Sequence, residues 1–109
     1  MTNPKMIANN LLPSEPIHPG EVLKDEIEFR SISQKKLAKE MGVSYTVLNE
    51  VLNAKRPLST EFAMLIEAIL DLDAEPLLKM QTRYDMQMAK KDSKFMEKLN
   101  KVCKIAAVL

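Results

Sequence analysis

Apolar residues recur at intervals of three and four along most of this chain, the period at which an α-helix turns one face toward a core. Glycine occurs only twice and proline six times, whereas residues that favour helices are abundant. The pattern predicts one helix over about residues 19–29, a pair within 34–53, a fourth over 59–70 and a fifth beginning at 73. The sequence therefore predicts an all-α protein with a compact five-helix bundle.

Each predicted helix has a candidate buried face. In the first helix the expected inward residues are Val22, Leu23 and Ile27, with Phe29 as a further candidate. In the pair they are Leu37, Met41, Val43, Leu48 and Val51, and in the fourth helix Phe62, Leu65, Ile66 and Ile69. Ser59 and Asp73 are expected to cap the fourth and fifth helices.

The segment 34–53 has the pattern of two helices that cross at a tight turn. Ala38 is small enough for the close approach of helices that meet at about 90–120°. Gly42 stands where the first helix must end, and glycine adopts a left-handed backbone without cost. Ser33 and Ser44 are good N-caps for the two helices. The pattern predicts a helix-turn-helix motif whose second helix reads DNA, although an ordinary αα-hairpin remains an alternative.

The outer face of the second helix supplies the candidates for reading bases. Helical spacing places Tyr45, Thr46 and Asn49 outside, near the end of the helix that enters a major groove. Asparagine bonds adenine, threonine contacts several bases, and tyrosine contacts phosphate or sugar. This helix has no arginine, so readout of A·T pairs or of DNA shape is favoured over readout of guanine. Each residue taken alone is as readily a solvated polar side chain.

Three further residues are placed to hold phosphates. Gln34 begins the first helix of the motif, and Lys55 and Arg56 directly follow the second. Residues 34–58 contain five basic and two acidic residues, a local charge of +3 in a chain of net charge +1. Positive charge is therefore concentrated at the motif, where it would fix the register of the protein on DNA.

The two ends differ from this middle domain, which we place at residues 18–90. Residues 1–17 are polar and hold three of the six prolines, so we expect a flexible N-terminal arm. Residues 91–109 predict a basic amphipathic helix with Phe95, Leu99 and Val102 on one face. Such a helix could lie on a membrane or a partner, but docking on its own domain or on a dimer mate is favoured.

Enzyme and metal chemistry find little support. His18 precedes Pro19 and lies three residues before Glu21, the spacing of a helix N-cap and its capping-box partner rather than of a catalytic base. Cys103 is the only cysteine, so we expect a buried or half-buried thiol with no disulfide and no metal. There is no glycine-rich phosphate loop. We expect no enzymatic activity and no cofactor.

The apolar stretches are also too short for a membrane span of about 18 residues. The segment MTNPKMIANN lacks the apolar stretch of a signal peptide. The expectation is a soluble cytoplasmic protein with no membrane contact.

Three segments together resemble one known family. These are HPGE at 18–21, NAKRPLS at 53–59 and QTRYD at 81–85. With them, the chain resembles the HigA-type antitoxins of the lambda-repressor-like (Xre-type) helix-turn-helix superfamily over about residues 17–90. The resemblance implies a five-helix DNA-binding core, usually dimeric, that represses its own operon and neutralises a RelE/HigB-like mRNA-cleaving toxin.

The resemblance also assigns residues. Ser44, Tyr45, Thr46 and Asn49 match the groove-facing positions of the family, and Lys55 with Arg56 match its phosphate-facing loop. The chain departs from the family at Leu77, where an aromatic residue is common, and in its basic tail. Two other readings stay open: a free-standing transcriptional regulator with no toxin, and a protein-interaction module that has lost DNA binding.

Overall fold

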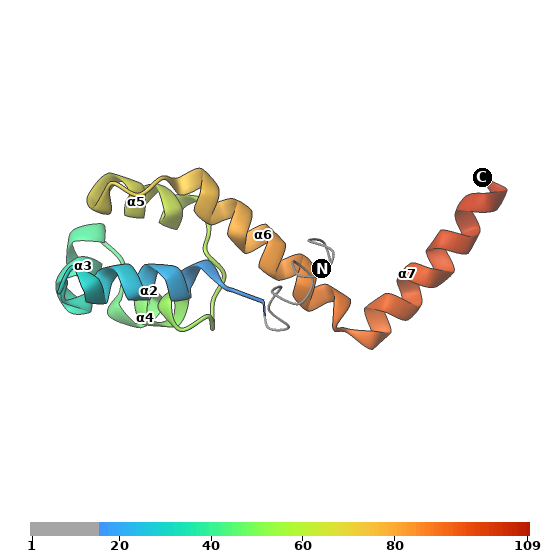
Figure 1. Ribbon diagram of the computed structural model, residues 1–109, viewed down its shortest axis with the longest axis horizontal. Coiled ribbons are helices and arrows are strands. Elements are labelled where there is room, and N and C mark those ends of the chain that lie inside the picture. Colours follow the sequence, from blue (N-terminus) through green and yellow to red (C-terminus); the bar gives the residue numbers. More distant parts are fainter. Residues whose placement is uncertain (1–15) are drawn as a thin grey trace, which may run out of the picture.

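The computed structural model describes residues 16–109, and within them all regular secondary structure is helical (Figure 1). The expected N-terminal arm therefore lies almost wholly outside the described residues. The helices are α2 (Pro19–Phe29), α3 (Gln34–Met41), α4 (Tyr45–Leu52), α5 (Thr60–Leu70), α6 (Ala74–Lys90) and α7 (Ser93–Ile105), followed by the 3-10 turn η1 (Ala106–Val108). The predicted all-α bundle of five helices with an additional C-terminal helix is confirmed.

The helices begin where the sequence places their caps. His18 Nδ1 accepts the Gly20 N–H at 2.9 Å, while Glu21 Oε2 accepts the His18 N–H at 3.0 Å, which completes the predicted capping box. Ser33, Ser44 and Ser59 accept backbone N–H groups at the starts of α3, α4 and α5. These contacts satisfy amide groups that a helix leaves unpaired in its first turn.

The turn between α3 and α4 is a left-handed cap at Gly42, with φ of 72°. The Gly42 N–H bonds back to the carbonyls of Ala38 and Lys39, and Ala38 itself is buried. A Cβ at Gly42 would meet no atom within 4 Å, so the backbone angle and not the available space requires glycine here. The predicted turn is confirmed.

The core lies between α2, α3, α4, α5 and the first half of α6. Its most deeply buried large apolar residues are Leu23, Ile27, Leu48, Val51, Leu52 and Ile66. Leu37, Met41 and Phe62 are buried as predicted, and Val43 and Leu65 pack against the core while remaining partly exposed.

Three predictions of buried residues were wrong. Val22 is 41% exposed, Phe29 86% and Ile69 39%. On α2 the inward line is set by Leu23 and Ile27, four residues apart, and helical geometry turns the side chains of Val22 and Phe29 away from that line. On α5, Ile66 and Leu70 define the corresponding line, which leaves Ile69 at its edge.

The start of α6 also differs from the prediction. Asp73 occupies the N-cap position, but its side chain accepts no capping hydrogen bond. Instead, Glu67 Oε2 from α5 accepts the Ala74 N–H at 3.2 Å. A carboxylate from the preceding helix thus takes the place of the local cap, and it ties α5 to α6.

Beyond Gln81, α6 leaves the core, and α7 turns away from its end so that the two helices form a V (Figure 1). Asp92 caps α7, because its carboxylate accepts the N–H groups of Lys94 and Phe95. Phe95, Leu99 and Val102 stay about half exposed. Of the two docking surfaces predicted for the tail, its own domain does not cover the stripe, and docking on a dimer mate stays a prediction. Cys103 is exposed, so its predicted burial was also wrong.

Across residues 16–109, no helix combines the length and apolar character that crossing a membrane requires.

Candidate nucleic-acid interface

The candidate DNA-binding residues lie along α4, the start of α3 and the loop after α4. Ser44, Tyr45 and Thr46 are exposed at the N-terminal end of α4, and Asn49 follows one turn later, half-buried. The opposite face of α4 carries Leu48, Val51 and Leu52, which are buried completely or nearly so. The burial of that face fixes the rotation of the helix and so fixes which side chains point outward.

Gln34 and Asn49 are joined directly. Asn49 Nδ2 donates to Gln34 Oε1 at 3.2 Å, which links the first turn of α3 to the middle of α4. An amide held in this way presents its remaining donor and acceptor in a fixed direction. The sequence made both residues candidates for contact with DNA but gave no indication of this bond, which joins residues 15 positions apart.

Ser44 has a structural task as well as an exposed position. Its hydroxyl oxygen accepts the Val47 N–H at 3.0 Å and caps α4. A hydroxyl that accepts this bond still has its own O–H to donate. Capping and contact with an external acceptor are therefore compatible at this residue.

The loop after α4 has a fixed conformation. Ala54 takes a left-handed φ of 61°, and the Lys55 N–H bonds to the Glu50 carbonyl at 2.8 Å. Lys55 and Arg56 are both exposed. Arg56 Nε and Nη2 donate to Glu50 Oε1 at 3.0 and 2.8 Å, so the guanidinium is held beside α4 by an ion pair.

Gly20 is a residue of the site that the sequence pattern did not single out. A Cβ at this position would lie 1.8 Å from the carbonyl oxygen of Val51 and 3.0 Å from His18 Nδ1. Only glycine lets the start of α2 approach the end of α4 this closely. The available signal was a glycine inside the first turn of a helix, where it lowers helix stability relative to alanine unless space demands it.

His18 likewise does more than cap α2. Its side chain is almost fully buried, and its ring meets that of Tyr84 edge to face, with centroids 4.9 Å apart. Burial lowers the pKa of the imidazole, while Glu21, the backbone of Arg56 and Asp85 act in the opposite direction. His18 therefore joins α2 to α6 and to the loop that carries Arg56.

Gln81 fixes the same loop from the other side. It is buried, its Oε1 accepts the Leu58 N–H at 2.8 Å, and its Nε2 donates to Asp85 Oδ1 at 2.9 Å. His18, Arg56, Gln81, Tyr84 and Asp85 all border one hollow of about 170 Å³. The HPGE, NAKRPLS and QTRYD segments thus meet at one place, which explains physically why they occur together.

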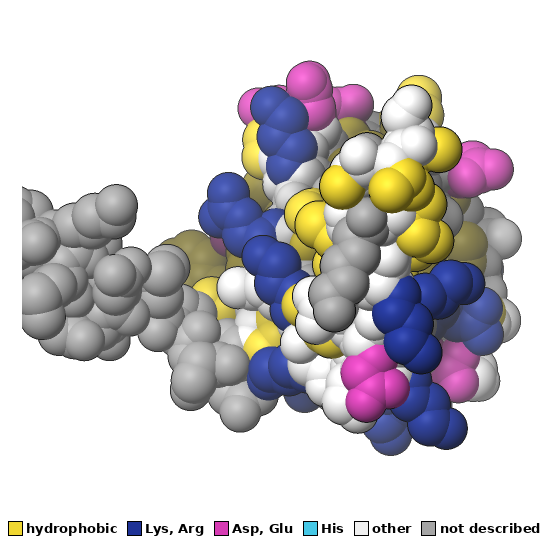
Figure 2. Space-filling view, turned by 90° about the vertical axis from the view of Figure 1, so that its right-hand side faces the viewer, with side chains coloured by type: hydrophobic (Ala, Val, Ile, Leu, Met, Phe, Trp, Pro, Cys, Tyr) yellow, Lys and Arg dark blue, Asp and Glu magenta, His cyan; other side chains and the backbone are white. Residues whose placement is uncertain are grey.

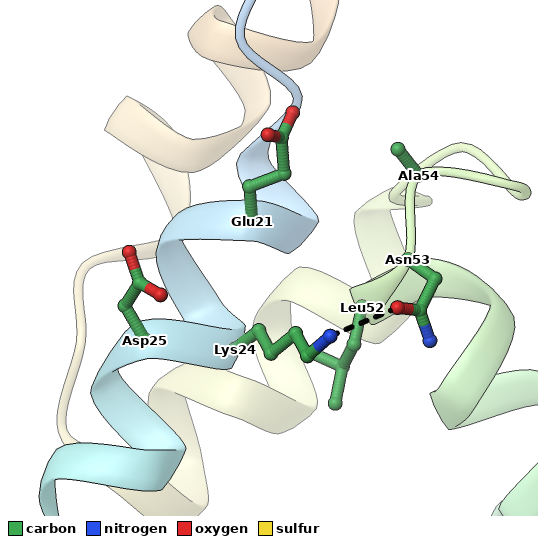
Figure 3. A pocket seen from close by; sticks show the side chains of 6 residues that line it. All are labelled: Glu21, Lys24, Asp25, Leu52, Asn53 and Ala54. Carbon is green, nitrogen blue, oxygen red and sulfur yellow. Dashed lines mark hydrogen bonds between the residues drawn. The ribbon is translucent and has the colours of Figure 1, made fainter.

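A second hollow, of about 450 Å³, lies between α2 and the end of α4 (Figure 3). Lys24 Nζ donates to Asn53 Oδ1 at 3.0 Å across it, with Glu21 and Asp25 on the α2 side. The Lys24 bond links α2 to the C-terminal end of α4 and so helps to hold α4 in place. Among the described residues, no group of three or more His, Cys, Asp or Glu side chains could hold a metal ion.

The helix-turn-helix family model matches residues 23–77, which include all of α3, α4 and α5. Virulence-associated protein I of Dichelobacter nodosus is 36% identical over 77 residues, covering 70% of this chain and 71% of the relative. The chain is also similar to solved structures. An addiction module antidote protein of the HigA family from Coxiella burnetii is 34% identical with a TM-score of 0.67, covering 77% of this chain and 94% of that one.

The Pseudomonas aeruginosa antitoxin HigA, solved with the higBA promoter, is 32% identical with a TM-score of 0.65, covering 69% of this chain and 83% of that one. The chain therefore belongs to the helix-turn-helix family, among its HigA-type antitoxins. This family is generally one of DNA-binding regulators and not of enzymes. The family match ends at residue 77, so α7 lies outside it.

Proposed function

We propose that the protein is a sequence-specific DNA-binding antitoxin that acts in the cytoplasm, represses its own operon and neutralises a RelE/HigB-like mRNA-cleaving toxin. The observation that carries the DNA-binding part is the exposure of Tyr45 and Thr46 at the first turn of α4, a helix whose opposite face is buried. A helix fixed in this way can enter a major groove with its N-terminal end first. The promoter in the Pseudomonas aeruginosa HigA structure supports the same role.

In this proposal Asn49 and Thr46 read bases. The Gln34 bond holds the Asn49 amide, which suits the bidentate recognition of adenine. Thr46 is exposed one turn before Asn49 and contacts a base edge or a thymine methyl group. Tyr45, at the first position of α4, contacts a phosphate or a sugar.

The remaining candidate residues hold phosphates. Ser44 and Gln34 stand at the starts of α4 and α3, where backbone N–H groups and the helix dipole favour a negative group. Lys55 and Arg56 extend the positive surface from the loop. Because Arg56 is already paired with Glu50, we expect Lys55 to contribute more to the salt dependence of binding.

The ion pair between Arg56 and Glu50 favours one alternative function. Glu50 is partly exposed on α4 beside the candidate DNA-contacting residues, and it neutralises the nearest arginine. A protein-interaction module that has lost DNA binding would tolerate this arrangement. A free-standing regulator differs from the proposal only in having no toxin.

Gel-shift titration with the DNA upstream of the coding sequence, at several salt concentrations, tests DNA binding. We expect tighter binding to this DNA than to a shuffled sequence of equal composition, and affinity that falls as salt rises. Equal affinity for both sequences at every salt concentration would favour the interaction module.

Co-expression with the product of a neighbouring open reading frame tests the toxin. If that product arrests growth and the Thr46→Ala and Asn49→Ala double variant still relieves the arrest, neutralisation of the toxin does not depend on DNA binding.

A further inference from the structure

Helix α7 exposes an apolar stripe that the described chain does not cover. Phe95, Leu99 and Val102 are 44%, 45% and 51% exposed, and they follow one another at helical spacing. Figure 2 looks at the end of the molecule from which α7 projects, and hydrophobic side chains lie open there beside lysine and arginine side chains. Exposing such a stripe to water is unfavourable, so its burial against a partner surface would lower the free energy.

This part of the chain is also strongly basic. Residues 90–109 contain six lysines and two acidic residues, a net charge of +4. Helical geometry places Lys98 at the border of the apolar stripe and Lys94 and Lys101 farther around the same side of α7. Their long side chains can reach around the helix to acidic groups at the border of a contact.

The opposite charge lies at the corner where α5 ends and α6 begins, which we call the acidic corner. Residues 59–79 contain five acidic residues and one lysine, a net charge of −4. Glu67, Asp71, Asp73 and Glu75 lie near the corner, whereas Glu61 lies in the first turn of α5. All five are exposed. Glu67, Asp73 and Glu75 border one hollow of about 400 Å³ together with Pro76 and Lys79. Met64, 58% exposed on α5, adds an apolar side chain to this region.

We propose that α7 of one copy of the chain docks on the acidic corner of a second copy, and that the second copy returns the same contact. Phe95, Leu99 and Val102 would cover the apolar part of α5 around Met64, with lysines at the border facing Glu67, Asp73 and Glu75. The 13 residues of α7 and the 11 of α5 give helices of similar length, about 20 and 16 Å. A twofold axis would repeat the contact and double its area.

The charge pattern favours a second copy of the chain over other partners for α7. The two segments have net charges of opposite sign and occur on the same chain, so a second copy offers each of them a complementary surface. The chain's own α7 does not use its own corner, because α6 separates the two along the length of the molecule (Figure 1). Direct pairing of α7 with another α7 would instead bring two basic helices together.

A charge-exchange experiment tests the proposal without DNA and so independently of the proposed function. In one variant, Lys94→Glu and Lys98→Glu make α7 acidic. In the other, Asp73→Lys and Glu75→Lys change the net charge of the hollow bordered by Glu67, Asp73, Glu75 and Lys79 from −2 to +2, so that the hollow becomes basic. Both pairs are exposed and lie outside the core, and circular dichroism checks that each variant is folded. Sedimentation equilibrium should show that each variant alone self-associates about tenfold more weakly than the wild type, or worse.

Mixing the two variants should restore association, because the acidic α7 then meets the basic corner while the unchanged pair of surfaces still matches. An unaltered dimer in the Asp73→Lys and Glu75→Lys variant would overturn the proposal. A wild-type chain that stays monomeric would also overturn it. If such a monomer bound anionic vesicles through α7, the stripe would belong to a membrane surface instead.

A separate double variant tests the apolar part of the contact. Leu99→Gln with Val102→Gln removes the stripe without touching the core, and Asn100→Ala is the matched control on another face of α7. The first should weaken the dimer about tenfold or more, and the second should leave it unchanged. Equal dimer affinity in both would overturn the docking of this stripe.

Discussion

Helices α4 and α7 are both amphipathic, yet only α4 buries its apolar face within the described chain. Leu48 and Leu52 of α4 are fully buried, whereas Leu99 of α7 is 45% exposed. The difference lies in the surroundings, because Gly20 and Ala38 let neighbouring helices approach the motif closely, while α6 carries α7 away from every core helix. Amphipathic spacing predicts that a helix needs a partner. The connections of the helix decide whether the same chain provides it.

The largest expected effect tests how closely the core is packed around α4. Gly20→Ala would place a Cβ 1.8 Å from the Val51 carbonyl oxygen, so α2 or α4 must move. We expect a loss of about 3 kcal/mol in the free energy of unfolding, measured by urea denaturation, together with weaker DNA binding. Gly42→Ala is the control, since it meets no atom and bears only the left-handed backbone strain of about 1–2 kcal/mol. A smaller loss for Gly20→Ala than for Gly42→Ala would contradict the close approach.

A second prediction concerns the outer face of α4. Asn49→Ala should cost about 1–3 kcal/mol of binding free energy at particular base pairs and little elsewhere, because a lost base contact also removes the penalty for the wrong base. Binding measured on a panel of single-base operator variants gives the pattern. Lys55→Gln is the control, and it should weaken all sequences alike and reduce the salt slope by about one unit. Unchanged sequence preference in Asn49→Ala would remove Asn49 from the reading residues.

A weaker effect is expected from pH, through His18. Burial lowers the pKa of its imidazole in the folded state, so the unfolded chain binds the proton more readily. The stability contributed by neutral His18 is therefore complete above about pH 6.5 and declines as the pH falls toward the lowered pKa. Urea midpoints measured across this range should decrease on acidification. His18→Asn keeps a capping side chain but does not titrate near pH 6, so its midpoints should decrease less. Parallel decreases in both proteins would assign the effect to other groups.

The smallest effect should follow removal of the tail. A chain ending at residue 91 loses α7 and η1, and none of the side chains described in these two elements belongs to the buried core. At a protein concentration low enough for monomers, its free energy of unfolding should change by less than about 0.5 kcal/mol. Leu23→Ala, in the core, should cost about 2–5 kcal/mol in the same assay. A comparable loss on truncation would mean that α7 stabilises the domain and that the contrast with α4 is false.

Features that depend on nearby residues could be predicted from the sequence. The caps at Ser33, Ser44 and Ser59, the capping box of His18 and the turn at Gly42 each involve residues within five positions of one another. Such contacts follow from local backbone geometry, so residue type and spacing are sufficient to locate them.

Features that depend on distant residues could not be predicted in this way. The approach of Gly20 to Val51 and the bond from Asn49 to Gln34 depend on the final packing of helices. Glu67 displaced Asp73 as the cap of α6 for the same reason. Within the candidate site, sequence therefore placed the side chains on the correct elements, but it did not show which of them hold one another.

The two side-chain pairs at the motif have a consequence for the entropy of binding. Asn49 is bonded to Gln34 and Arg56 to Glu50 before any nucleic acid is present. Ordering a flexible side chain on association costs about 0.5–1.5 kcal/mol of conformational free energy. These four side chains are already partly ordered in the folded chain, so binding orders them less. The surface is thus preorganised, and partners that fit it should be distinguished mainly by how long they stay bound.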